Sequence, residues 1–366
     1  MHECFASWRL CEKQGRPASP AGACRRPVYR GLARFCYRKC MLPDDVARLI
    51  RGFQPSRVLL TAIELNVFTA IGEGATAEEV AAKLNSDPRA TGMLLNALAA
   101  LGLLSKNGGA FRNTPVTARF LDDASPESER LAWMHSVHMW KSWSTLTDCV
   151  RAGTSVSRRE GAAPDAAWTA AFIAAMHRNA TERAPLVVKA ASGGRFRRLL
   201  DVGGGSAAYS IAFAQAFPEL EAEVLDRPEV LPIAQRHIDA AGLSDRVRTR
   251  AGDLVTEDFG TGYDLVLVSA ICHMLGPGGN RDLLRRCYQA LAPNGRVVIQ
   301  DFILDEERTS PTVAALFALN MLVATREGSS YAEGEYTGWL QEAGFRDIRR
   351  VELPGPTDLM VATRPE

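Results

Sequence analysis

The second half of the chain alternates short apolar runs with segments of helical periodicity. The apolar runs cover 198–202, 222–225, 264–269 and 295–303, and a further strand of mixed residues is predicted at 247–251. Short apolar strands separated by helices are typical of a parallel sheet with helices on both faces. We therefore predict a Rossmann-like α/β domain of five strand–helix units with a mostly parallel sheet.

Two further apolar stretches close the chain, at 345–353 and 358–363. Pro354-Gly355-Pro356 lies between them, and these residues favour a tight reversal. The pattern predicts an antiparallel hairpin at one edge of the sheet.

One helix of this half has clear boundary signals. It is expected at 281–291, between the fourth and fifth strands. Asn280 precedes it and is a favoured N-cap residue, while Pro293 and Gly295 follow it and stop helices.

The first half shows a different pattern. A helix is predicted over 57–71, and Thr76-Ala-Glu-Glu79 is a capping box that opens a second helix. Asp87-Pro88 starts a third helix over 89–101, and a hairpin follows at 103–112. Three helices and a hairpin predict a winged helix.

Winged helices are familiar as DNA-binding modules, but the third helix argues against that use here. Arg89 is its only basic residue, whereas a recognition helix needs basic and amide side chains. Its other side chains are mostly apolar: Met93, Leu94, Leu95, Leu98, Ala99 and Leu101. We expect a homodimer interface with no nucleic-acid contact, and a DNA-binding regulator is the alternative.

The chain has 366 residues, 46% of them hydrophobic, and a net charge of +1. These values suit a globular protein of two domains and give no reason to expect nucleic acid or a membrane as partner. No apolar run approaches the ~20 residues that span a bilayer. Cys149, Cys272 and Cys287 are far apart in sequence, as expected for buried thiols of a cytoplasmic protein.

Residues 1–40 differ from the rest of the chain. They hold nine Lys or Arg against two Glu, and five of the eight cysteines. They lack apolar periodicity, so we expect either a disordered extension or a wrongly assigned translation start upstream of Met41. Deletion of residues 1–40 should then leave folding intact. A transit peptide, or half of a metal site at Cys36 and Cys40, is the alternative.

The predicted domains are a winged-helix dimerisation domain at 41–125, linking helices within 126–192 and a catalytic domain at 193–366. The linking helices, predicted over 131–150 and 166–191, carry aromatic and methionine side chains at helical spacing, which predict either ordinary core or an apolar slot for a flat acceptor. The residues assigned to this acceptor pocket are Trp133, Met139, Trp143, Phe172, Met176, Asn320 and Met321.

The first strand of the sheet runs directly into a glycine turn. Asp201 lies near its tip, and Gly203, Gly204 and Gly205 follow at once. Glycines let a ligand approach the backbone, and the N–H groups of the following helix point toward it. A carboxylate here suits a cationic amino group better than a pyrophosphate.

Two more acids lie at the tips of the next strands. Asp226 follows the second strand, at a spacing suited to ribose hydroxyls, and Asp253 follows the third. An adenosine with an ammonium group fits these acids, so we predict S-adenosyl-L-methionine (SAM) as cofactor. The alternative is an NAD-dependent dehydrogenase, because Gly203, Gly205 and Ala208 satisfy a loose dinucleotide pattern.

The fourth strand leads to the candidate catalytic residue, His273. Methyl transfer from a sulfonium to a hydroxyl requires the acceptor oxygen to lose a proton. An imidazole is well suited to take that proton near neutral pH. An isolated histidine is more often structural, but its position past a strand tip favours the general-base interpretation.

Three motifs resemble those of the plant-type small-molecule O-methyltransferases and their bacterial relatives. They are Leu-Leu-Asp-Val-Gly-Gly-Gly, Gly252-Asp253-Leu254 and Ile271-Cys272-His273. The resemblance covers residues 41–366 and implies a dimer, an aromatic or polyketide-like acceptor, and S-adenosyl-L-homocysteine as product. It further implies that the glycine turn lines the methionyl end, Asp226 holds the ribose, and Asp253 and Leu254 hold the adenine.

The chain departs from this family pattern around the histidine. Met274-Leu275 replaces the usual Asp-Trp, and Ser269, counted with the cofactor site, replaces a lysine. By the resemblance, Asp301 replaces a supporting Glu and Ser330 occupies the position of a second. These changes leave open a C-methyltransferase, or a SAM-binding relative that does not methylate, such as a hydroxylase.

Overall fold

The computed structural model describes residues 43–156, 166–191 and 193–366. The predictions made for residues 1–40 fall outside this range. The chain divides into two units, with the boundary between Ser56 and Arg57. Within the described parts, no helix is long and apolar enough to cross a membrane.

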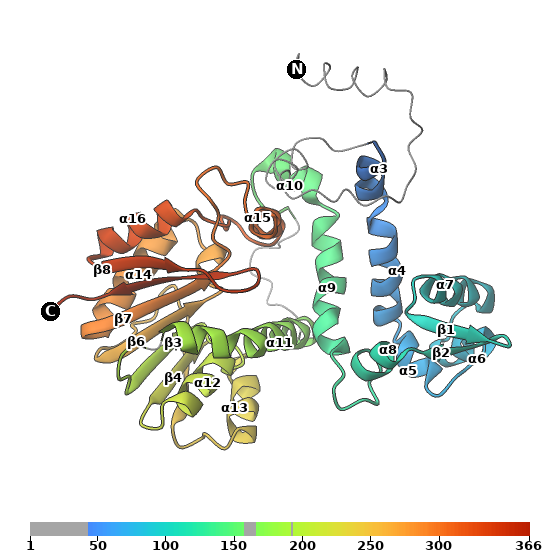
Figure 1. Cartoon of the computed structure of the whole chain (residues 1–366), viewed down its shortest axis with the longest axis horizontal. Coiled ribbons are helices and arrows are strands. Elements are labelled where there is room, and N and C mark those ends of the chain that lie inside the picture. Colours follow the sequence, from blue (N-terminus) through green and yellow to red (C-terminus); the bar gives the residue numbers. More distant parts are fainter. Residues whose placement is uncertain (1–42, 157–165, 192) are drawn as a thin grey trace, which may run out of the picture. The chain divides into compact units, whose positions relative to one another are not determined.

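The first elements along the chain are helices followed by a small hairpin (Figure 1). They are α3 (Pro43–Arg51), α4 (Phe53–Glu64), α5 (Val67–Ile71), α6 (Ala77–Leu84), α7 (Pro88–Ala100), β1 (Leu104–Asn107), β2 (Ala110–Asn113) and α8 (Pro115–Phe120). The three helices α5 to α7 and the antiparallel hairpin confirm the predicted winged-helix pattern.

The predicted helix boundaries in this region are partly right. The Thr76–Glu79 capping box is present, and the Asp87 carboxylate accepts a hydrogen bond from the Ala90 N–H at 2.7 Å at the start of α7. The single helix predicted over 57–71 is wrong. Asn66 adopts a left-handed backbone conformation, with φ of 59°, and separates α4 from α5.

The next helices are α9 (Arg130–Trp143), α10 (Leu146–Ala152) and α11 (Ala166–Ala191). The last matches its prediction, but one helix had been expected over 131–150. Ser144 and Thr145 interrupt it, since their hydroxyls bond to the carbonyls of Trp140 and Ser142.

The second half of the chain is built around a seven-stranded sheet of order β5-β4-β3-β6-β7-β9-β8. The sheet is parallel except where β9 pairs with β7 and β8. Its strands are β3 (Arg198–Val202), β4 (Glu221–Asp226), β5 (Val247–Ala251), β6 (Tyr263–Ser269), β7 (Leu291–Asp301), β8 (Arg346–Val351) and β9 (Asp358–Thr363). The mostly parallel sheet and its closing hairpin are therefore confirmed.

Helices cover both faces of this sheet (Figure 1). One core joins alternate strand residues such as Leu200 and Val266 to helices α14 and α16. The other joins the neighbouring residues Leu199 and Leu265 to α11, α12 and α13. The helices are α12 (Ala208–Ala216), α13 (Leu231–Ala240), α14 (Pro277–Ala290), α15 (Thr312–Ala324) and α16 (Glu333–Ala343).

Two predictions for this half are wrong. The described chain has no helix between β5 and β6, so the strand–helix alternation is incomplete. Asn280 is not a cap, because α14 begins three residues earlier at Pro277. Asn280 is instead fully buried inside the helix and donates to the carbonyls of Cys272 and Leu275. The predicted burial of Cys149, Cys272 and Cys287 is confirmed.

Candidate active site

The glycine turn after β3 is packed too tightly for side chains at its first two positions. Gly203 has φ of +69°, and a Cβ there would lie 2.5 Å from Cδ1 of Ile271. A Cβ on Gly204 would lie 2.7 Å from Cγ of Asp201. A Cβ on Gly205 would meet nothing within 4 Å, although its φ of +57° also favours glycine. The turn is therefore tightly packed at Gly203 and Gly204, and it has free space beside Gly205. A ligand could approach the backbone there.

Asp201 lies beneath this turn with no exposed surface. The Ser210 hydroxyl donates to one carboxylate oxygen at 2.7 Å, and the other oxygen has no partner among the described residues. Burial raises the pKa of Asp201 to about 7, with Asp226 adding to the rise and the bonds from Ser210 opposing it. A buried oxygen with unused capacity fits a role toward a cationic ligand group.

Asp226 braces the glycine turn. One of its carboxylate oxygens accepts from the Gly205 N–H at 2.8 Å, and the other accepts from the Arg227 N–H at 2.7 Å. Burial raises the pKa of Asp226, and these two backbone bonds oppose the rise. This carboxylate, together with the Gly203 N–H that donates to the Leu225 carbonyl at 2.8 Å, holds the tip of β4 and the turn after β3 together.

The tip of β5 lies next to the same turn. The Gly252 N–H donates to the Asp226 carbonyl at 3.0 Å, and Leu254 would be within 3.6 Å of a Cβ on Gly203. Asp253 is exposed, and one of its carboxylate oxygens accepts from the Val255 N–H at 2.8 Å. The tertiary structure thus brings the three predicted strand tips to one edge of the sheet.

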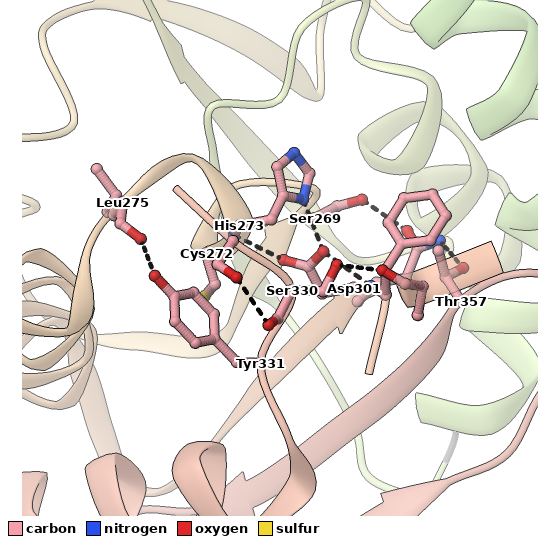
Figure 2. Close-up of polar contacts among 12 residues, drawn as sticks. Ser269, Cys272, His273, Leu275, Asp301, Ser330, Tyr331 and Thr357 are labelled. Atoms are coloured by element: carbon pink, nitrogen blue, oxygen red, sulfur yellow. Dashed lines mark hydrogen bonds and ion pairs between the residues drawn. The ribbon is translucent and has the colours of Figure 1, made fainter. Parts of the chain in front are cut away.

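His273 lies in a short 3₁₀ turn, Cys272–Met274, after the end of β6, and is 6% exposed. Its Nδ1 is 2.6 Å from the Asp301 carboxylate, and its backbone N–H donates to the other carboxylate oxygen at 3.1 Å (Figure 2). Asp301 is itself buried and accepts a third bond, from the Phe302 N–H at 2.8 Å. A carboxylate at Nδ1 fixes that nitrogen as the donor and leaves Nε2 as the acceptor.

Two phenylalanines that the sequence reasoning missed surround this histidine. The rings of Phe302 and Phe317 are stacked 3.8 Å apart, and Phe317 meets the imidazole edge-on at 4.8 Å. Phe302 directly follows Asp301 in the sequence, and this adjacency was the available signal. Phe317 comes from α15, and only the tertiary structure brings it to the histidine.

Ser330 takes a different position from the one expected of a second supporting residue. It is fully buried, and its hydroxyl donates to the Ala314 carbonyl at 2.9 Å. The neighbouring Ser329 N–H donates to the His273 carbonyl at 2.9 Å. This segment therefore supports the backbone of His273, while Asp301 supports the imidazole (Figure 2).

A buried polar network beside the site was also missed. The hydroxyls of Ser269 and Tyr209 both donate to the Gln300 side-chain oxygen, at 2.6 and 2.5 Å. The Gln300 amide donates in turn to the Thr357 hydroxyl at 2.7 Å. Gln300 ends an apolar strand segment next to Asp301, where a lone amide could have been noticed.

The described contacts join only some of the residues assigned to the acceptor pocket. The Trp143 indole N–H donates to the Asn320 side chain at 2.9 Å, which joins α9 to α15. The ring of Phe172 is stacked on Trp168 at 5.2 Å. Trp133 instead packs against the core of the N-terminal domain, under the guanidinium of Arg178 at 4.6 Å. Met321 is buried, and Met139 and Met176 are half-buried.

The comparisons with known proteins agree with this geometry. Residues 143–346 match the O-methyltransferase domain family, and residues 47–123 match the O-methyltransferase dimerisation domain. The chain is 33% identical to 3-hydroxy-5-methyl-1-naphthoate 3-O-methyltransferase of Streptomyces sahachiroi, over 86% of this chain and 92% of that protein. It is 30% identical to L-tyrosine C(3)-methyltransferase of Streptomyces lavendulae, over 88% and 93% of the two chains.

A solved structure gives the same result. The crystal structure of human N-acetylserotonin methyltransferase in complex with SAM is 26% identical and has a TM-score of 0.74, with 94% of this chain and all of that chain covered. SAM is thus the cofactor, and the dehydrogenase alternative is set aside. The chain belongs to the O-methyltransferase family and is a SAM-dependent methyltransferase with a dimerisation domain.

Proposed function

We propose that this enzyme methylates a phenolic hydroxyl of a small planar aromatic or polyketide-like acceptor, with His273 as the general base. The observation that carries the proposal is the 2.6 Å contact between His273 Nδ1 and the buried carboxylate of Asp301. Because Nδ1–H is held by Asp301, the imidazole takes the acceptor proton at Nε2. The carboxylate then stabilises the imidazolium that results.

The proposed cofactor residues are those at the strand tips. When bound, SAM supplies a methyl group on a positively charged sulfur that is open to in-line attack. Gly203, Gly204 and Gly205 present their backbone to its methionyl end, and Asp201 compensates the ammonium from below. Asp226 holds the ribose, while Asp253, Leu254 and Ser269 complete the site. The contact of Gly203 with Ile271, two residues before His273, supports a shared site for base and cofactor.

An aromatic acceptor is favoured by two features. The name of the naphthoate relative specifies a hydroxylated bicyclic aromatic. Phe302 and Phe317 also give His273 an apolar, aromatic surround in this chain. Flat rings pack well against such side chains.

The proposed enzyme is a homodimer that contacts no nucleic acid. The dimerisation-domain match supports this, as do exposed apolar side chains such as Met93 at 61% and Val116 at 64%. Sedimentation at micromolar concentration should give a dimer. The interface of this dimer should bury more than about 2,000 Å². A monomer, or salt-sensitive binding to DNA, would contradict this part of the proposal.

The general base is tested by His273→Ala with an uncharged hydroxynaphthalene as acceptor. The rate of methyl transfer should fall by about 10²- to 10⁴-fold while SAM affinity by calorimetry stays unchanged. Asp226→Ala is the complementary variant, and it should weaken SAM binding by about 1–3 kcal/mol. A normal rate in the His273 variant would mean that the acceptor arrives ionised, and lost SAM affinity would make the histidine structural.

Carbon methylation is a second candidate. The specific observation in its favour is the 30% identity to L-tyrosine C(3)-methyltransferase. The same histidine can deprotonate a phenol whose ring carbon then accepts the methyl group, and the dienone that results loses its ring proton while its oxygen regains one, which restores the phenol. NMR of the methylated product distinguishes an O-methyl from a C-methyl group directly.

A further inference from the structure

Helix α9 presents two different faces. Trp133, Met134 and Val137 pack against the core of the N-terminal domain. Because side chains three, four and eight positions apart share a helix face, His135, His138, Met139 and Trp143 lie on another. Of these, Trp143 is bonded to Asn320 on α15.

The two histidines on this second face have unused hydrogen-bonding capacity. Nδ1 of His135 and Nδ1 of His138 are both buried without a partner among the described residues. Buried polar atoms are nearly always bonded, since leaving one unpaired is costly. Two such atoms one helical turn apart therefore require an explanation.

His135 also borders an aromatic pair. Its ring meets Phe172 edge-on at 5.3 Å and Trp168 at 6.2 Å, and those two rings are stacked 5.2 Å apart. Burial, and to a lesser extent His138, lowers the pKa of His135 to about 4. Near neutral pH this imidazole is uncharged and carries one donor and one acceptor nitrogen.

This face is connected to the catalytic histidine. Asn320, the partner of Trp143, lies one helical turn from Phe317, and Phe317 meets His273 at 4.8 Å. From Trp143 back to His135 is eight residues of α9, or about 12 Å at 1.5 Å per residue. The two ends of this face are therefore farther apart than the width of one aromatic ring.

We propose that His135 and His138 form a second polar subsite that binds an uncharged oxygen, a carbonyl or hydroxyl, at the end of the acceptor remote from the methylated hydroxyl. This inference rests on the proposed function and specifies its substrate class. The rings of Phe172 and Trp168 contact the acceptor next to this subsite. A carboxylate is disfavoured because a buried anion needs a cationic partner, and Arg178 on α11 is already paired with Glu129 at 2.6 Å.

The test compares two phenols that differ in one carbonyl, 7-hydroxy-1-tetralone and 5,6,7,8-tetrahydro-2-naphthol. Their dissociation constants are measured by calorimetry with the S-adenosylhomocysteine-loaded enzyme, so the result does not depend on catalysis. A neutral hydrogen bond should favour the ketone by about three- to ten-fold in the unmodified enzyme. His135→Phe and His138→Phe should each reduce that preference and leave the affinity for the tetrahydronaphthol unchanged.

Lys141→Ala is the matched control, because this lysine is exposed on the opposite side of α9. It should preserve the ketone preference. Equal affinity of the unmodified enzyme for both phenols would overturn the subsite. Tighter binding of the phenol that carries a carboxylate at position 1 than of the ketone would also overturn it. If the enzyme binds the ketone preferentially but methylates neither phenol, the subsite stands and the proposed acceptor chemistry fails instead.

Discussion

Replacing Asp301 by asparagine removes the charge behind His273 with almost no change in side-chain size. The carboxylate accepts three hydrogen bonds, from the imidazole Nδ1 at 2.6 Å and from the backbone N–H groups of His273 and Phe302 at 3.1 and 2.8 Å. The amide nitrogen of asparagine is itself a donor. Whichever way the amide is turned, it therefore faces at least one of these three donors.

The orientation of the amide sets the size of the effect. If its oxygen stays against the imidazole, the variant loses one charge-assisted hydrogen bond, which contributes about 1.5–3 kcal/mol. At about 1.36 kcal/mol per tenfold in rate, kcat should fall about 10- to 150-fold. The opposite orientation would protonate Nε2 and remove the base, so the loss would approach that of His273→Ala.

The assay measures initial rates at saturating SAM and acceptor, with SAM affinity determined separately by calorimetry. Asp282→Asn is the matched control, since this aspartate is partly exposed on α14 and pairs only with Arg285 and Arg286 among the described residues. An Asp301→Asn enzyme with normal kcat would show that the carboxylate does not support the base. A parallel loss of SAM affinity would show that it holds the site together instead.

Two further predictions concern the glycine turn. Gly203→Ala should lower the free energy of unfolding by about 1–3 kcal/mol and weaken SAM binding, because φ is +69° and the new Cβ would lie 2.5 Å from Ile271. Gly338→Ala is the control, because this glycine lies in α16 and has nothing within 4 Å of its Cβ position. It should not lower the free energy of unfolding measured in urea, and an equal loss of stability in the two variants would refute the steric argument. Asp201→Asn should change the pH dependence of stability. Since folding raises the pKa of Asp201 from 3.8 to about 7, this carboxyl stabilises the fold fully below pH 3.8 and loses that contribution as the pH rises through 7. As the pH rises from 4 to 7, the free energy of unfolding of the variant should therefore increase relative to that of the unmodified protein, by an amount on the order of 4 kcal/mol. A difference in unfolding free energy that stays constant across that range would contradict the linkage.

The sequence alone was sufficient for the order and type of most elements. The apolar run at 264–269 became β6, whose residues 265–268 are all buried, because a parallel strand covered on both sides must be apolar on both faces. The Thr76 capping box and the Asp87 cap were readable because they are local hydrogen bonds between residues near in sequence. The cap prediction for Asn280 failed because this side chain bonds outside its own helix, to the loop that carries His273. The helix breaks at Asn66 and at Ser144–Thr145 have local causes that the apolar pattern does not reveal.

The site divides in the same way. The sequence determined the glycine turn, the tip acids and His273, because each lies at a strand end and strand ends of a parallel sheet converge. Only the tertiary structure decided which partners these side chains bind. Asp226 accepts from the Gly205 N–H, Asp301 bonds to the His273 imidazole, and the Ser330 hydroxyl donates to the Ala314 carbonyl. Side-chain contacts between elements depend on the register of strands and the packing of helices, which one-dimensional patterns do not encode. The unpaired His135 and His138 are likewise visible only in the folded chain, where their neighbours can be counted.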